Sequence, residues 1–197
     1  DVTTPSAGAS PGLRHVSLDL AAGQITGLAG VSGNGQAALS DLVSGLITPQ
    51  SGSLTLNGAN PTDWSPRRAI TAGIARIPED RHKHGLVLDF DLSENIVLQT
   101  YDKPQFQNKG FIRFKNRLEY SNKLIDAYDI RAGKRAKTIL RSMSGGNQQK
   151  VIVARELERE PKLIIAVTPT RGLDVGAIEY IHKQLIAQRD AGNAVLL

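Results

Sequence analysis

A glycine-rich segment between an apolar run and an amphipathic run constrains the fold of this chain more than any other feature. The apolar run covers residues 25–29, the glycine-rich segment residues 30–35, and the amphipathic run residues 36–46. In the last of these, apolar residues recur at helical spacing on one face. A strand that turns through glycines into a helix is one unit of an α/β fold, so we expect a parallel sheet covered by helices.

The glycine-rich segment keeps the spacing of a phosphate-binding loop without its reactive side chains. Such loops read G-x-x-x-x-G-K-[ST], where the lysine reaches the phosphates and the hydroxyl binds Mg²⁺. Gln36 stands in the lysine position and Ala37 in the hydroxyl position. The backbone N–H groups and the helix N-terminus still attract an anion, so we expect a weak nucleotide site; the alternative is a plain strand–turn–helix corner. The predicted binding residues are Gly30, Ser32, Gly33, Asn34, Gly35, Gln36, Ala37 and Ala38.

Composition narrows the class of protein. The 197 residues carry a net charge of +5 and no cysteine, which excludes disulfides and thiolate metal sites. No apolar run approaches the roughly 20 residues that span a bilayer, and the first residues do not resemble a signal peptide. The positive charge suits an anionic partner, but on charge alone general solubility is the preferred explanation. Without a carboxylate or thiolate cluster nearby, His82 and His84 read as part of a solvated basic loop, and we expect no metal site.

Local patterns predict further elements along the chain. Residues 16–20 and 53–57 alternate apolar and polar side chains, as half-buried strands do. Residues 163–167 are continuously apolar, as expected for a strand buried on both faces of a parallel sheet. Ser65 and Pro66 have the residue types of an N-cap and a first helical position.

Residues 144–150 form a second candidate anion cradle. They read Ser-Gly-Gly-Asn-Gln-Gln-Lys and open a predicted helix, so a serine hydroxyl and two glycines lie at a helix N-terminus. A plain N-cap at Ser144 is the alternative. The run resembles the signature motif of the ATP-binding cassette (ABC) ATPases, in the form found in sugar and nucleoside importers. The resemblance implies that Ser144, Gly145, Gly146, Asn147 and Gln148 close over the γ-phosphate held by a partner domain.

Other segments resemble the same ATPases, but their catalytic side chains differ. In the family, a buried strand ends in Asp-Glu, which organise Mg²⁺ and polarise the attacking water. Val167 and Thr168 stand in those positions, and neither can ligate a metal through a carboxylate or act as a base near neutral pH. Asp174 resembles the D-loop aspartate and also suits an N-cap. Glu79 stands where the Q-loop usually has glutamine. No catalytic residue of the family is therefore intact here.

The resemblance covers nearly the whole chain and implies a fold. It implies the α/β fold of a P-loop NTPase, namely an ABC nucleotide-binding domain with an antiparallel β-subdomain and a helical subdomain. The expected parts are a C-terminally truncated core at residues 13–90 and 146–197, a helical subdomain at 91–145, and a linker or disordered start at 1–12. Residues 194–197 read as a buried strand, so we expect a piece of a longer protein; the position of the family's switch histidine would lie beyond Leu197.

Within the family, the chain resembles the second, degenerate ATP-binding domain of two-domain importers for nucleosides and simple sugars. This implies that its signature motif supports ATP hydrolysis at the partner site, where Mg²⁺ binds, while its own loop holds ATP weakly. The domain alone would be inactive or very weak as an ATPase. Implied partners are a companion ATP-binding domain, transmembrane permease subunits and, indirectly, a periplasmic or lipoprotein solute-binding protein, with no nucleic acid.

The implied location is cytoplasmic, peripheral on the inner face of the bacterial cell membrane. Two other interpretations stay open at the level of sequence. One is a nucleic-acid-associated ABC ATPase, which the net charge of +5 favours slightly. The other is an interaction module that binds no nucleotide.

Overall fold

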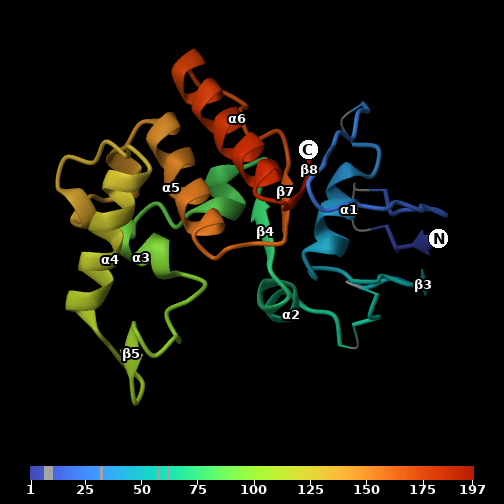
Figure 1. The fold of residues 1–197 in the computed structure, drawn as a ribbon, viewed down its shortest axis with the longest axis horizontal. Helices are drawn as coiled ribbons and strands as arrows, with labels where there is room; N and C mark the ends of the chain where they lie inside the picture. Colours follow the sequence, from blue (N-terminus) through green and yellow to red (C-terminus); the bar gives the residue numbers. More distant parts are fainter. Residues whose placement is uncertain (7–10, 32, 57, 62) are drawn as a thin grey trace. The chain divides into compact units, whose positions relative to one another are not determined.

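A computed structural model describes residues 1–6, 11–31, 33–56, 58–61 and 63–197, and these residues form two compact units (Figure 1). The first unit comprises Asp1–Arg76, Glu160–Val167 and Leu185–Leu197, and the second comprises Ile77–Arg159 and Thr168–Gln184. Among the described residues, no helix combines the length and apolarity that a bilayer crossing needs.

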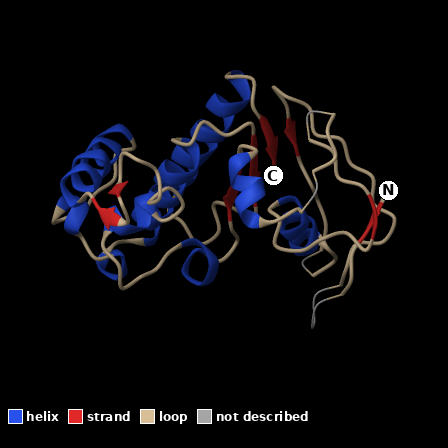
Figure 2. Cartoon of the chain, turned by 90° about the horizontal axis from the view of Figure 1, so that it is seen from below, coloured by secondary structure: helices blue, strands red, loops and turns tan. Residues whose placement is uncertain are grey.

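The helices and strands are short, and much of the described chain between them is loop (Figure 2). The α-helices are α1 (Gln36–Val43), α2 (Pro66–Thr71), α3 (Leu92–Val97), α4 (Phe114–Ala127), α5 (Gly145–Leu157) and α6 (Val175–Asp190). The strands are β1 (Val2–Thr3), β2 (Ile25–Thr26), β3 (Ser51–Gly52), β4 (Ile74–Ile77), β5 (Gln107–Asn108), β6 (Phe111–Ile112), β7 (Leu163–Ala166) and β8 (Ala194–Leu196). A π-helical turn, η1, covers Arg81–Gly85, and 3₁₀ turns cover Arg135–Lys137 and Leu140–Ser142.

A four-stranded sheet with the order β2-β8-β7-β4 organises the first unit, although Ile77 at the end of β4 is assigned to the second. β8 pairs in parallel with both β2 and β7. All four residues of β7 are buried, because a parallel strand is covered on both faces. The parallel sheet predicted from the continuous apolar run at 163–167 is therefore confirmed.

The core of the first unit packs α1 and α2 with residues of β4, β7 and β8. α1 ends earlier than the predicted 36–46, because Gly45 takes φ +76° just after the C-cap Ser44. A Cβ at position 45 would lie 2.4 Å from the Ser65 carbonyl oxygen, so only glycine fits this approach. Ser65 caps α2 by accepting from the Arg68 N–H, and Pro66 takes the first helical position, as predicted.

An antiparallel pair, β1 with β3, also belongs to the first unit. Residues 1–12 were expected to be a linker or a disordered start; within them Val2–Thr3 form β1, and the buried Val2 pairs with Gly52. The strand predicted at 16–20 reduces to one bridge between Val16 and Val2, and that predicted at 53–57 reduces to a bridge between Leu56 and Ala59. Alternating side chains indicate that one face of a segment is buried, but they do not provide a second strand for it to pair with.

The second unit is mainly helical, and α3 packs against both α4 and α5 (Figure 1). The helical insertion predicted at 91–145 lies in this unit; its limits as a subdomain stay a prediction. α4 buries Leu124 and Ile125. α5 begins at Gly145, because Ser144 provides the N-cap.

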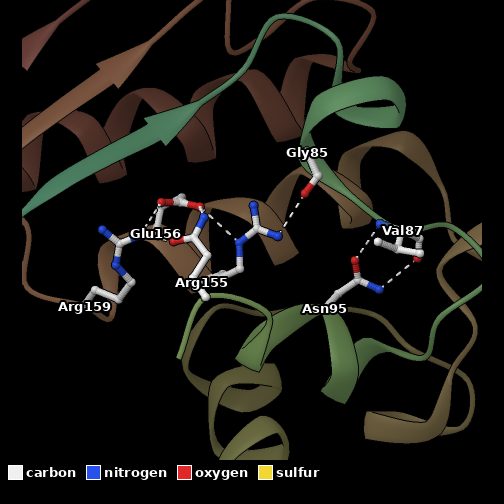
Figure 3. Close-up of polar contacts among 7 residues, drawn as sticks. Gly85, Val87, Asn95, Arg155, Glu156 and Arg159 are labelled. Carbon is white, nitrogen blue, oxygen red and sulfur yellow. Dashed lines mark hydrogen bonds and ion pairs between the residues drawn. The ribbon is translucent and has the colours of Figure 1, made fainter. Parts of the chain in front are cut away.

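α3 is held at its N-terminus by a capping box. The Asp91 side chain accepts from the Glu94 N–H at 2.8 Å, and the Glu94 carboxylate accepts from the Asp91 N–H at 2.9 Å. One turn later the buried Asn95 satisfies both backbone groups of Val87, donating to the carbonyl at 3.0 Å and accepting from the N–H at 2.9 Å (Figure 3). The chain that enters α3 is thereby fixed against it.

α5 carries a buried cluster of charged side chains, which Figure 3 shows together with Asn95 and Val87. Glu156, only 1% exposed, accepts from Arg155 Nε and from Arg159 Nη1, each at 3.0 Å. Arg155 also donates to the Gly85 carbonyl at 2.9 Å. A buried carboxylate between two guanidinium groups is tolerated because its hydrogen-bonding capacity is met. The cluster therefore ties the C-terminal half of α5 to the end of η1.

Candidate functional site

The glycine loop joins β2 to α1 within the first unit. Gly33 and Gly35 have φ values of +91° and +100°, in the region where only glycine is unstrained, and Asn34 between them is exposed. Ala38 is buried in the core as part of α1. Ser32 lies outside the described residues. The predicted strand–glycine loop–helix arrangement is thus confirmed around residues 30–38.

The side chain of Gln36 folds back into this loop. Its Nε2 donates to the Val31 carbonyl at 3.0 Å, and its Oε1 accepts from the Asn34 N–H at 3.1 Å. A Cβ built on Gly30 would lie 2.5 Å from the same Nε2. The amide therefore occupies the space beside Gly30 and engages one of the N–H groups that would otherwise face an anion.

The side chains at the predicted metal positions do not fit Mg²⁺, which takes oxygen ligands. Ala37 is exposed and carries no side-chain oxygen. Val167 follows β7 and packs on the apolar core of the first unit. Thr168, in the second unit, is exposed with φ +40° and offers a neutral hydroxyl. Among the described residues, there is no group of three or more His, Asp or Glu placed to hold a metal. No metal-dependent step is assigned to this loop.

The signature segment lies in the second unit, where Ser144 caps α5. Its Oγ accepts from the Asn147 N–H at 3.4 Å and from Asn147 Nδ2 at 2.9 Å. Asn147 in turn accepts from the Arg131 N–H at 2.7 Å. Ser144 is exposed. The N-cap geometry is therefore present, and it leaves the serine at the surface of the unit.

The two glutamines of the segment are buried and face different neighbours. Gln148, 5% exposed, donates from Nε2 to the Leu140 carbonyl at 2.9 Å, while its Oε1 lies 2.9 Å from His82 Nε2. Gln149, 2% exposed, donates from Nε2 to the Pro169 carbonyl at 2.8 Å. Side chains on adjacent positions of one helix thus connect α5 to two separate loops.

Asp174 lies against the second glycine of the segment. Its Oδ1 accepts from the Ala177 N–H at 2.9 Å, so it is the N-cap that the sequence allowed. A Cβ on Gly146 would lie 3.2 Å from Asp174 Oδ2 and 3.1 Å from the Ala177 Cβ. Glycine at position 146 therefore permits the start of α5 and the start of α6 to approach each other.

Glu79 is joined to the segment that precedes Asp174. Its carboxylate forms an ion pair with Arg171. Arg81 donates from Nη1 to the Arg171 carbonyl at 3.1 Å, and its Nη2 lies 2.8 Å from a Cβ position on Gly145. Within the second unit, the structure thus brings together residues predicted for the Q-loop, the signature motif and the D-loop. The glycine loop belongs to the first unit.

Two exposed carboxylates near this group are stabilised in their charged form. The hydrogen bond from the Lys83 N–H, with a second from the His82 N–H, holds the pKa of Asp80 below its usual value. A hydrogen bond from Lys150 lowers the pKa of Asp129 in the same way. Lys150 follows the glutamines on α5 and bonds the Asp129 carboxylate at 2.7 Å. This ion pair joins α5 to the segment that follows α4.

Sequence reasoning missed Arg81, His82 and Arg171. It read His82 and His84 as part of a solvated basic loop; His82 is exposed, but its Nε2 also bonds the buried Gln148. The contact between His82 and Gln148 joins residues 66 positions apart, and periodicity cannot reveal such a pair. The one local signal was Asp80, a residue type that caps tight turns.

Comparisons with known proteins agree with this architecture. The family model described as ABC transporter matches residues 13–171. The guanosine import ATP-binding protein NupO of Bacillus subtilis is 51% identical over 94% of this chain and 36% of its own length. The nucleoside import ATP-binding protein NupA of Lactococcus lactis is 46% identical over the same shares. The ribose import ATP-binding protein RbsA 1 of Agrobacterium fabrum is 38% identical over 86% of this chain and 32% of its own. The chain therefore spans about a third of the length of these relatives.

Solved structures support the fold. A nucleotide-free ATP-binding cassette from an ABC transporter superposes with a TM-score of 0.74 at 19% identity, covering 99% of this chain and 77% of that one. A dimeric cassette in a post-hydrolysis state with ADP and Pi gives 0.75 at 22% identity, covering 99% and 84%. The expected α/β fold of the P-loop ABC ATPases is confirmed.

Proposed function

Since the chain belongs to the ABC transporter family, we propose that it is a nucleotide-binding domain of an importer for nucleosides or simple sugars. The relatives named as guanosine and nucleoside importers support a nucleoside, because they are 51% and 46% identical, against 38% for the ribose importer. Members of the family bind ATP with Mg²⁺, so ATP is the ligand we assign to the complete assembly.

We further propose that the domain acts asymmetrically, as the second of two ATP-binding domains in one polypeptide. The observation that carries this is the Gln36 amide, which bridges Val31 and Asn34 inside its own loop. A lysine there would present a charge to the phosphates, and a charge-assisted hydrogen bond is roughly twice as strong as a neutral one. The loop therefore holds ATP weakly and without bound Mg²⁺.

The signature segment has the complementary role in this proposal. Ser144 is exposed at the N-terminus of α5, a 13-residue helix whose dipole favours an anion there. We assign Ser144, Gly145, Gly146, Asn147 and Gln148 to the γ-phosphate held by the companion domain. Asp174 borders this segment, and Glu79 is linked to it through Arg171 and Arg81. The core at 13–90 and 146–197 and the helical subdomain at 91–145 would belong to a cytoplasmic assembly with membrane-embedded permease subunits and, indirectly, a solute-binding protein.

The test uses the complete polypeptide with its permease in proteoliposomes. We expect Ser144→Arg to lower ATP turnover by a factor of about 10² or more, because a bulky cation replaces a phosphate-facing hydroxyl. Gln36→Ala, the matched change in the glycine loop, is expected to keep turnover within about twofold, because binding at this loop contributes little to the transition state. Equal losses in both variants would contradict the asymmetry. Unchanged turnover in Ser144→Arg would overturn the assignment of the signature segment.

A further inference from the structure

The turn that follows Glu79 is pre-ordered by one carboxylate. Asp80 Oδ1 accepts from the backbone N–H groups of both His82 and Lys83 at 3.0 Å, and the Asp80 carbonyl accepts from the His84 N–H at 3.0 Å. These bonds fix the backbone at the start of η1. The directions in which the side chains of residues 81 and 82 leave the turn are therefore fixed as well.

The His82 side chain leaves the turn toward Gln148 and bonds it. The Gln148 Nε2 donates to the Leu140 carbonyl, so its Oε1 is left as an acceptor. It follows that the His82 Nε2, 2.9 Å away, carries hydrogen and donates. Gln148 is 5% exposed, so both ends of its amide are bonded inside the unit. The side chain has one orientation, which His82 helps to set.

Arg81 approaches the segment three residues earlier than Gln148, at Gly145 in the first turn of α5. Its Nη1 donates to the Arg171 carbonyl at 3.1 Å, and its Nη2 lies 2.8 Å from a Cβ position on Gly145 and 3.9 Å from one on Gly172. Any side chain at position 145 would collide with the guanidinium unless Arg81 moved. Gly145 therefore admits a group of its own chain on this side, in addition to any role toward phosphate.

The rest of η1 is fastened along α5. A Cβ on Gly85 would lie 2.6 Å from Ile152 Cδ1, and the Gly85 carbonyl accepts from Arg155 at 2.9 Å (Figure 3). Gln148, Ile152 and Arg155 follow the spacing i, i+4, i+7, so η1 contacts one continuous face of the helix. Three contacts on one face therefore join η1 to α5.

We propose that Arg81 and His82 are positioning residues that hold the signature segment, from Ser144 to Gln148, in the geometry that a companion domain's nucleotide requires. The inference rests on the proposed function of that segment. In this proposal Arg81 acts through Gly145, and His82 acts through Gln148. Because Arg81 and His82 lie two and three residues after Glu79, η1 also carries any displacement of Glu79 to the start of α5.

The neighbours of these two residues provide an internal contrast. Lys83 and His84 belong to the same turn and, like His82, are exposed. Among the described residues, no hydrogen bond or ion pair joins either side chain to α5. A solvated basic loop would make all four positions equivalent, whereas this geometry makes residues 81 and 82 differ from residues 83 and 84.

The experiment measures ATP turnover by the complete polypeptide with its permease in proteoliposomes. We expect Arg81→Ala and His82→Ala to lower kcat about tenfold with KM for ATP changed less than about twofold, because misplaced catalytic groups cost rate more than binding. His82→Gln is expected to restore most of kcat, because its amide N–H can donate to Gln148. Lys83→Ala is the matched control and should behave as the wild type.

Unfolding midpoints of the same proteins separate positioning from stability. If Arg81→Ala does not fold, Arg81→Lys replaces it, and kcat should still fall because an ammonium lacks the planar fork. Unchanged kcat in the folded Arg81 and His82 variants, or a raised KM with unchanged kcat, would overturn the proposal. Ser144→Arg is the reference: if it leaves turnover intact, the proposed function fails, independently of Arg81 and His82.

Discussion

The Nε2 of Gln36 donates to the carbonyl of Val31, five residues earlier in the chain, at 3.0 Å. The same amide accepts from the Asn34 N–H, so one side chain closes both sides of the glycine loop. A phosphate that enters must displace this amide and gains no charge-assisted partner in return. The residue in the lysine position therefore opposes binding twice, by filling the cradle and by being neutral.

Replacing Gln36 by lysine should strengthen nucleotide binding at this loop. We expect Gln36→Lys to tighten ATP binding about tenfold, because a charged donor replaces a neutral one, and Gln36→Ala to change it less than about threefold. Calorimetry on the complete polypeptide, with the companion domain's phosphate loop disabled, measures the affinity. Equal affinity in Gln36→Lys and the wild type would show that the cradle itself cannot hold phosphate.

A methyl group at position 146 should separate α5 from Asp174. We expect Gly146→Ala to destabilise the protein by about 1–3 kcal/mol, the usual cost of overpacking, because the new Cβ meets Asp174 and Ala177. Gly133→Ala is the matched control, since its Cβ would have no atom within 4 Å. Denaturant unfolding measures both variants. A Gly146→Ala midpoint equal to that of Gly133→Ala would contradict the close approach.

Breaking the buried charge cluster should be costly. Glu156→Ala leaves Arg155 and Arg159 without their shared carboxylate, and we expect a loss of about 3–5 kcal/mol in the free energy of unfolding. Glu119→Ala removes an exposed partner of Lys115 and should change stability by less than about 0.5 kcal/mol. Chemical denaturation of both variants tests the contrast. Similar losses would place Glu156 in a hydrated environment.

Acid should weaken the turn that Asp80 caps. Because hydrogen bonds from Lys83 and His82 lower the folded pKa of Asp80, the unfolded chain binds more protons than the folded chain between the two pKa values. The stabilisation of the folded state by the charged Asp80 is present above the unfolded pKa of about 4 and is lost as pH falls below it. Asp80→Asn should therefore flatten the fall of the unfolding midpoint in that range. Parallel curves for variant and wild type would exclude this role.

Local patterns were sufficient for much of the fold. The continuous apolar run at 163–167 predicted a buried parallel strand, because only strands covered on both faces are apolar throughout. Ser65 and Pro66 predicted the start of α2, because caps act within one turn. The alternating runs at 16–20 and 53–57 gave wrong strands, because alternation does not name a pairing partner.

The candidate site was less accessible to sequence reasoning. The signature segment was predicted because seven consecutive residues carry the pattern, and its role stays a prediction. Arg81 and Arg171, 90 positions apart, meet only because the fold brings η1 to the loop before α6. The inward fold of the Gln36 amide depends on rotamer and loop geometry that residue type alone does not specify.

The two glutamines that follow the glycines have a consequence for mutational scanning. Gln149 bonds the Pro169 carbonyl and is nearly inaccessible, so a change there disturbs the loop leading toward Asp174. Loss of activity in a Gln149 variant would be mistaken for loss of a ligand contact, since the residue is adjacent to the segment proposed to face phosphate. A mutational scan of this region will therefore detect changes in the position of neighbouring loops as well as changes in phosphate recognition. Only kinetic constants separate these two effects.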